Sequence, residues 1–174
     1  PRARRWLRCR SRMAGLAHDF SGVRGVPGRL ERRGIAAAQD LKGCSEAELA
    51  AVRQAAGSFV LPEQYFEFLG LMGREAGRLF RGTDMFFPGL LECHDQAREF
   101  AEDDDPGLTV ANRHFFGHHA GYQWYLFQRG TAEVFMYTEE SGPPVAKGED
   151  FLDFLWGTIG GRGAKEATGE KDPR

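Results

Sequence analysis

The sequence has 174 residues and a mass of 19.4 kDa, which suits one domain with tails better than two domains. Apolar residues make up 41% and charged residues 28%, so the chain has enough apolar material for a packed interior. Its longest uncharged apolar stretch, residues 85–91, is interrupted by Pro88 and is far shorter than the ~20 residues of a membrane-spanning helix. Three Cys, an odd number, do not form a disulfide framework and are typical of a reducing compartment. We therefore expect a cytoplasmic protein.

Charge is divided unevenly along the chain. Residues 1–34 hold ten Arg against two acids, whereas residues 35–160 hold nine Lys and Arg against twenty Asp and Glu. Residues 92–153 alone have thirteen acids and four bases. A surface of that sign repels nucleic-acid phosphates and speeds the encounter with a basic partner. We therefore expect a basic protein partner, with neither a nucleic acid nor a membrane as ligand.

The Arg-rich beginning has no apolar segment long enough for a secretory signal, and its Gly, Arg and Pro residues follow no helical period. We expect a disordered leader over residues 1–38, with Met13 as a candidate for the true start. A basic nucleic-acid arm and an organelle transit peptide are the alternatives. The Gly- and Lys-rich residues 161–174 predict a flexible tail, so the folded domain is expected to span residues 39–160.

Two helices are predicted at the start of this domain. The first begins at Ser45, which with Glu48 has the spacing of a capping box, and it ends at Gly57. The second begins at Pro62 and ends at Gly73, and its apolar residues recur at helical spacing. The connector between them is short, so the two helices should be antiparallel neighbours.

The middle of the domain is predicted to combine an extended segment with a third helix. Residues 79–87 are aromatic and non-periodic and contain a glycine, which indicates a strand or a bent extended segment. Pro88 can open a helix that stops before Pro106. The apolar seam of that helix consists of Leu90, Cys93, Ala97 and Phe100.

In the next part of the chain the residue pattern has a period of two, which indicates consecutive antiparallel strands. Residues 122–128 and 133–138 predict an antiparallel hairpin, and residues 114–118 a third strand. Both faces of residues 122–127 carry large side chains, which is typical of a central strand covered on both sides. A final helix is expected from near Glu149. This order predicts an α+β fold: an antiparallel sheet with helices packed against it, two of them N-terminal and one C-terminal.

Three segments have an order and spacing that point to a known family. They are LPEQYFEFLGLMG (residues 61–73), a Leu-Pro helix ending in Gly; FFGHHAGYQWYLF (residues 115–127), a glycine turn before an aromatic strand; and FLDFLW (residues 151–156), a closing helix after a Pro-rich turn. Together they resemble the SUKH superfamily, which includes yeast Smi/Knr-type cell-wall regulators and many bacterial toxin-immunity proteins. The resemblance covers about residues 43–156.

The resemblance implies an α+β binding platform without catalysis or cofactor. Bacterial members commonly neutralise a cognate toxin, often a nuclease, by binding it, and many such toxins are basic. We therefore interpret the chain as a non-catalytic, immunity-type inhibitor whose partner is a basic toxin domain. One alternative is a regulatory scaffold like the yeast relatives. Another is a small hydrolase that uses Cys93 and the histidines.

The candidate partner contacts are acidic or aromatic and lie in the second half of the chain. They are Asp103, Asp104, Asp105, Glu139, Glu140, Tyr122 and Trp124. The three consecutive aspartates follow a predicted helix C-terminus, where negative charge is unfavourable, so stability does not explain them. The plainer interpretation of the same residues is solvated loops and, for the two aromatic side chains, core packing.

The spacing of the histidines and of one cysteine argues against catalysis and metal binding. On a strand that rises roughly 3.3 Å per residue, His114 and His118 would stand about 13 Å apart, too far to share one ion bound at about 2 Å. Cys93 lies on a predicted apolar seam, and its neighbour His94 points elsewhere on the helix. We predict no catalytic residue, no metal site and no cofactor.

Overall fold

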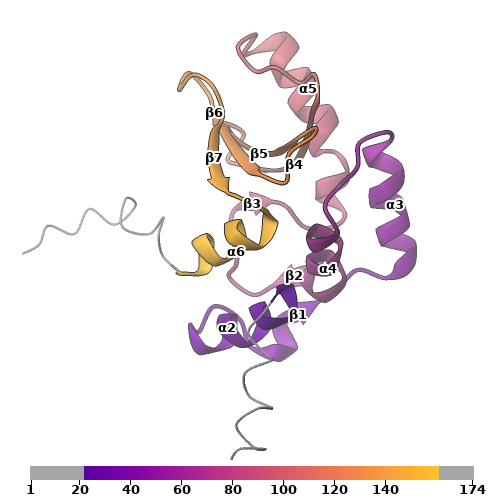
Figure 1. Cartoon of the computed structure of the whole chain (residues 1–174), viewed down its shortest axis with the longest axis vertical. Helices are drawn as coiled ribbons and strands as arrows, with labels where there is room; N and C mark the ends of the chain where they lie inside the picture. Colours follow the sequence, from indigo (N-terminus) through magenta and orange to yellow (C-terminus); the bar gives the residue numbers. More distant parts are fainter. Residues whose placement is uncertain (1–21, 161–174) are drawn as a thin grey trace, which may run out of the picture.

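The structure is a computed structural model that describes residues 22–160; the expected tail, Met13 and the rest of residues 1–21 lie outside the described residues. It is an α+β fold, as predicted, built on a five-stranded antiparallel sheet (Figure 1). The helical elements are η1 Val23–Gly25, α2 Val26–Arg32, η2 Ala38–Asp40, α3 Glu46–Ala56, α4 Glu63–Met72, η3 Gly89–Leu91, α5 Cys93–Asp103 and α6 Phe151–Gly160. The strands are β1 Leu41–Lys42, β2 Glu75–Ala76, β3 Thr83–Asp84, β4 Arg113–His119, β5 Gln123–Gln128, β6 Val134–Thr138 and β7 Val145–Gly148.

Helices cover both faces of the large sheet, whose strand order is β3-β4-β5-β6-β7. Figure 1 shows α5 on one side of the sheet and α6 with α4 on the other. The buried apolar side chains accordingly form two clusters. The larger one joins Phe116 and Phe127 of the sheet to α4 and α6, and the smaller one joins Phe115 and Trp124 to α5. The sheet is therefore the middle layer of the domain.

The predicted hairpin and the predicted third strand are confirmed. β5 pairs antiparallel with β4 and with β6 and lies at the centre of the sheet. Its side chains alternate between the two clusters, with Trp124 and Leu126 facing α5 and Tyr125 and Phe127 facing α4 and α6. The prediction of a central strand covered on both sides therefore also holds.

The prediction that this strand begins at Tyr122 is wrong by one residue, because β5 begins at Gln123. Three residues, Ala120, Gly121 and Tyr122, join β4 to β5, and the first two have φ of 52° and 81°. Two central residues with positive φ are typical of the tight turn that matches strand twist. Tyr122 is therefore the last residue of the turn rather than part of the sheet, and its side chain is 42% exposed.

One edge strand of the large sheet lies within a predicted extended segment, and the other was not predicted. Residues 79–87 contribute only the two-residue β3, and the turn at residues 141–144 is followed by β7 before α6 begins. β7 pairs with β6 at the edge of the sheet, and three of its four residues are exposed. A strand so short and so exposed has no apolar alternation by which the sequence could indicate it.

The predicted disordered leader is wrong for residues 22–38. Val23, Val26 and Leu30 are completely buried, on η1 and α2, and these elements pack against α4 and α6. Their spacing places the three side chains on one side of a short helical stretch, and Pro27 is tolerated because it lies in the first turn. The folded domain therefore begins before residue 39 and includes part of the Arg-rich segment.

Both predicted N-terminal helices are confirmed within one residue of their expected starts. At the start of α3 the backbone N–H of Ser45 donates to Glu48 Oε2 over 2.8 Å, and the backbone N–H of Glu48 donates to Ser45 Oγ over 3.4 Å. This is the predicted capping box, and the bond from the Ser45 backbone holds the pKa of Glu48 below its usual value. α4 follows after a short connector, as expected.

The aromatic ring of Tyr65 joins α4 to the sheet and to α6. Its centroid lies 5.4 Å from that of Phe116 on β4, 5.4 Å from Phe127 on β5 and 5.1 Å from Phe151 on α6. The side chain is completely buried, and its hydroxyl has no hydrogen-bond partner among residues 22–160. Burial raises the pKa of this hydroxyl. Tyr65 therefore stabilises the fold through its ring and not through its oxygen.

Replacement of Leu30 tests whether α2 belongs to the folded domain. Leu30→Ala should lower the free energy of unfolding by about 2–5 kcal/mol, because it empties a buried position. Glu31→Ala, at the exposed next position of the same helix, should change it by less than about 0.5 kcal/mol. Urea denaturation followed by circular dichroism measures both. Equal stability of the two variants would mean that α2 is not part of the core.

Two replacements of Tyr65 separate the contribution of the ring from that of the hydroxyl. Tyr65→Phe should leave the free energy of unfolding unchanged or raise it, because it removes a buried hydroxyl without a partner. Tyr65→Ala should lower it by about 3–5 kcal/mol through loss of the ring contacts. Chemical denaturation of both variants provides the comparison. A loss of more than about 1 kcal/mol in Tyr65→Phe would contradict this account.

Candidate functional site

An acidic groove of about 450 Å³ runs between α5 and the β3 end of the large sheet, and we call it the α5 groove. Cys93 and Ala97 are completely buried and hold α5 to the sheet. A different face of the same helix borders the groove. Glu99 and Asp103 lie on that face, four residues apart, and Asp104 follows at the C-terminal end of the helix. The helix thus lines the groove with carboxylates because its other face is buried.

Three neighbouring strands supply the opposite wall. The register pairs Asp84 of β3 with His118 of β4, and His118 with Trp124 of β5. His118 Nε2 lies 3.4 Å from Asp84 Oδ2, and the His118 ring centroid lies 4.9 Å from the Trp124 ring centroid. Phe100 of α5 also packs on Trp124, at 5.6 Å between ring centroids. The groove therefore has an aromatic floor between two acidic walls.

The close approach of β3 to β4 depends on a glycine. The ladder between β4 and β5 has an irregularity between Phe115 and Gly117. A Cβ atom at Gly117 would lie 3.1 Å from the side chain of Met85 and 3.2 Å from the carbonyl oxygen of Asp84. A side chain at this position would require Met85 or the backbone of Asp84 to shift by a few tenths of an ångström. The absence of a side chain at Gly117 therefore lets Asp84 lie beside His118 at the wall of the groove.

The negative charge of the groove is not balanced by nearby bases. In the part of the chain that the structure describes, no Lys or Arg pairs with Glu99, Asp103 or Asp104. The nearest arginine in the sequence, Arg98, pairs instead with Asp95 over 3.1 Å. The last turn of α5 also has no basic residue to offset its dipole. These carboxylates therefore do not stabilise the fold, and their charge remains available to a ligand.

The structure brings together three of the seven predicted contact residues. Asp103, Asp104 and Trp124 all line the α5 groove. Trp124 is only 3% exposed, so it forms the floor and is not a protruding anchor, in agreement with the plainer core interpretation. The signal for Asp103 and Asp104 was their unfavourable position at a helix C-terminus. Asp84 was not among the predicted contact residues, because the residue pattern of its segment has neither a helical nor a strand period.

The other four predicted residues lie outside the groove. Asp105 has a structural role, because its carboxylate accepts hydrogen bonds from the Tyr137 hydroxyl and, over 3.0 Å, from the backbone N–H of Gly107. Tyr122 is exposed, and its carbonyl oxygen accepts a 3.0 Å hydrogen bond from the backbone of Glu139. Glu139 and Glu140 are exposed in the turn after β6. Tyr122 and Glu139 thus lie together, but apart from the groove.

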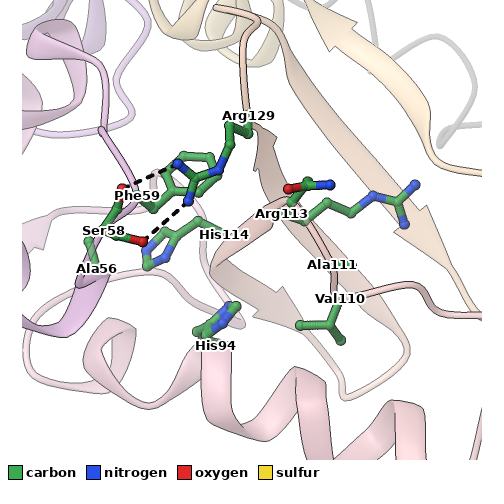
Figure 2. A pocket seen from close by; sticks show the side chains of 10 residues that line it. Ala56, Ser58, Phe59, His94, Val110, Ala111, Arg113, His114 and Arg129 are labelled. Atoms are coloured by element: carbon green, nitrogen blue, oxygen red, sulfur yellow. Dashed lines mark hydrogen bonds between the residues drawn. The ribbon is translucent and has the colours of Figure 1, made fainter.

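The histidines of β4 have separate surroundings. His118 faces Asp84 in the groove, and His119 Nδ1 lies 3.1 Å from the hydroxyl oxygen of Thr83. His114, near the start of the strand, stacks on His94 at 5.3 Å between ring centroids (Figure 2). Within residues 22–160, no group of three or more His, Cys, Asp or Glu side chains is arranged to hold a metal ion.

Cys93 is placed for packing. Its side chain is completely buried, and its thiol donates to the carbonyl oxygens of Asp84 and Gly89 over 3.3 and 3.7 Å. Burial raises the pKa of the thiol to about 12. The reactive thiolate is therefore almost absent at neutral pH, which argues against Cys93 as the nucleophile of a hydrolase.

Comparisons with known proteins add no relative. No protein-family model matches the chain, and searches of curated proteins and of solved structures also find no match. The resemblance to the SUKH superfamily stays a prediction from the sequence. Within the described residues, no helix is long and apolar enough to cross a membrane.

Proposed function

We propose that this chain is a non-catalytic protein-binding domain that receives a basic partner in the α5 groove. One observation carries the proposal: Glu99, Asp103 and Asp104 border one concave surface, and no base within residues 22–160 pairs with them. Uncompensated carboxylates of this kind attract Lys and Arg side chains of a partner. Charge-assisted hydrogen bonds to those side chains are about twice as strong as neutral ones.

Two parts of the groove would contribute in different ways. The exposed carboxylates of α5 steer the encounter, an effect that salt screens beyond about 8 Å at physiological ionic strength. The floor at Phe100 and Trp124 is apolar, so the aliphatic stem of an inserted Lys or Arg can pack on it while the charged end reaches Glu99 or Asp103. The bound complex is therefore held by both charge and packing.

Among basic proteins, the resemblance to SUKH proteins favours a toxin as the partner. We propose an immunity-type inhibitor that works in the cytoplasm and occludes a basic, cognate toxin, of which a nuclease is one class. The burial of Cys93 and the separation of the β4 histidines weigh against the hydrolase alternative. A regulatory scaffold is the remaining alternative, and it predicts several unrelated partners and no protection of cells against a toxin.

A charge-matched pair of triple variants tests the proposal. Glu99→Gln, Asp103→Asn and Asp104→Asn together remove three charges from the α5 groove. Glu31→Gln, Glu46→Gln and Glu67→Gln remove three exposed charges from α2, α3 and α4, so the net charge changes equally. The groove variant should keep its stability, since the carboxylates it loses lie at the unfavourable end of α5. It should associate with the partner about tenfold more slowly or worse.

The assay co-expresses each variant with the protein encoded immediately upstream and follows growth, and surface plasmon resonance then measures association with the purified partner. The groove variant is expected to lose protection, and the control variant to keep it. If both variants lost protection equally, the effect would come from net charge and not from the groove. If the groove variant still protected the cells, the α5 groove would not be the docking site. A neighbour that neither harms growth nor binds would overturn the immunity function.

A further inference from the structure

A second pocket, of about 300 Å³, lies at the opposite end of α5 from the groove, and we call it the histidine pocket. Its walls come from distant parts of the chain. Ser58 and Phe59 follow α3, His94 lies in the first turn of α5, His114 lies near the start of β4, and Arg129 lies in the turn after β5 (Figure 2). The packing of α5 along β4 brings these segments together.

The lining of this pocket has the opposite charge to the rest of its region. Residues 92–153 contain only four bases against thirteen acids, yet two of those bases, Arg113 and Arg129, line the pocket. None of its lining residues is an acid. A concave surface that contains the guanidinium of Arg129 and no carboxylate, in an otherwise acidic region, favours an anionic ligand.

The two imidazoles in the pocket are stacked and largely buried. Their planes are inclined by 16°, and His114 is only 7% exposed. Burial lowers the pKa of His94, and burial together with the nearby His94 lowers the pKa of His114 to about 4. Both rings are therefore neutral at pH 7, and each can donate one N–H. His94 Nδ1 is buried and has no hydrogen-bond partner in the described part of the chain.

The guanidinium of Arg129 can donate hydrogen bonds to a stronger acceptor than its present partner. It donates to the carbonyl oxygen and to the hydroxyl oxygen of Ser58, both over a long 3.4 Å, and it lies 5.4 Å from the centroid of the Phe59 ring. Bonds of that length are weak, and a guanidinium has five N–H donors. Arg113 differs: its side chain points away from the two histidines (Figure 2) and donates to the carbonyl oxygen of Thr109 over 2.7 Å.

We propose that the histidine pocket binds a small oxyanion, a phosphate or a carboxylate group, through the guanidinium of Arg129 and the N–H donors of His94 and His114. The planar fork of an arginine matches both anions, and the Ser58 hydroxyl adds a further donor beside it. The volume admits a group larger than a free ion. This site is independent of the α5 groove, so either can fail without the other.

Nuclear magnetic resonance titration of the full chain with sodium phosphate and with sodium acetate tests the proposal. Chloride keeps the ionic strength constant at pH 7. Saturable shifts are expected in the imidazole signals of His94 and His114 with at least one anion, and the anion that gives them identifies the group. Shifts that grow linearly with both anions, or that spread over the surface, would overturn the proposal.

Arginine variants supply the matched control. Arg129→Gln should weaken the saturable binding about tenfold or more, whereas Arg113→Gln, which removes the same charge one residue from His114, should change it less than about twofold. Arg129→Lys, which keeps the charge and loses the fork, should fall between them. Amide spectra verify that each variant is folded. Equal weakening by Arg113→Gln and Arg129→Gln would leave only a general effect of charge and overturn the site.

Discussion

The packing of the Tyr65 ring against Phe116, Phe127 and Phe151 is the contact on which the rest of the structure depends. It joins α4, the two central strands and α6 through one buried cluster, with ring centroids 5.1 to 5.4 Å from Tyr65. These aromatic side chains lie on one face of β4 and β5. The opposite face of the same strands can then receive α5 on a second, smaller cluster.

Because the face of α5 that packs on the sheet holds the helix in place, the outer face can carry charge. Its seam at Cys93 and Ala97 is completely buried, whereas Glu99 and Asp103 are exposed. The two ends of the helix therefore differ in character. Carboxylates border a groove at the C-terminal end, while His94 and Arg129 line a pocket without acids at the other. One helix packed across one sheet thus creates two sites of opposite charge.

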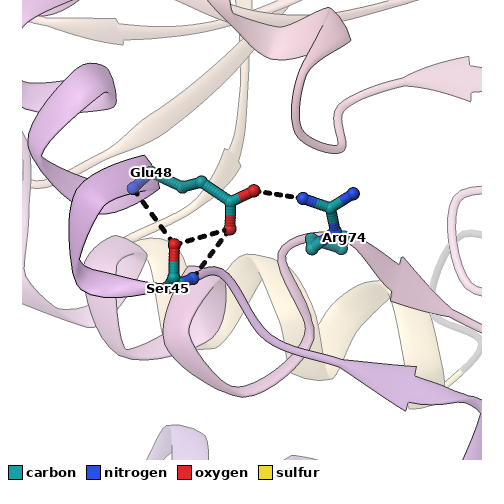
Figure 3. Close-up of polar contacts among 3 residues, drawn as sticks. All are labelled: Ser45, Glu48 and Arg74. Carbon is teal, nitrogen blue, oxygen red and sulfur yellow. Dashed lines mark hydrogen bonds and ion pairs between the residues drawn. The ribbon is translucent and has the colours of Figure 1, made fainter.

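The sequence predicted those parts of the fold whose signals are local. The capping box of Ser45 and Glu48 marked the start of α3, and Figure 3 shows it together with the ion pair from Glu48 to Arg74, which no spacing predicted. α2 was missed because its few apolar residues stand among Gly, Pro and Arg. Asp103 and Asp104 could be predicted from the helix dipole. The contact of Asp84 with His118 and the stacking of His94 on His114 depend on tertiary register, which one sequence does not reveal.

Paramagnetic relaxation of the backbone amides by nitroxide co-solutes of equal size and opposite charge measures the surface potential residue by residue, without any partner. At low ionic strength the cationic nitroxide should relax the amides of Glu99 to Asp104 and of Asp84 more strongly than the anionic one does. Equal relaxation by the two probes, or stronger relaxation by the anionic one, would contradict the claim that the α5 groove presents uncompensated negative charge.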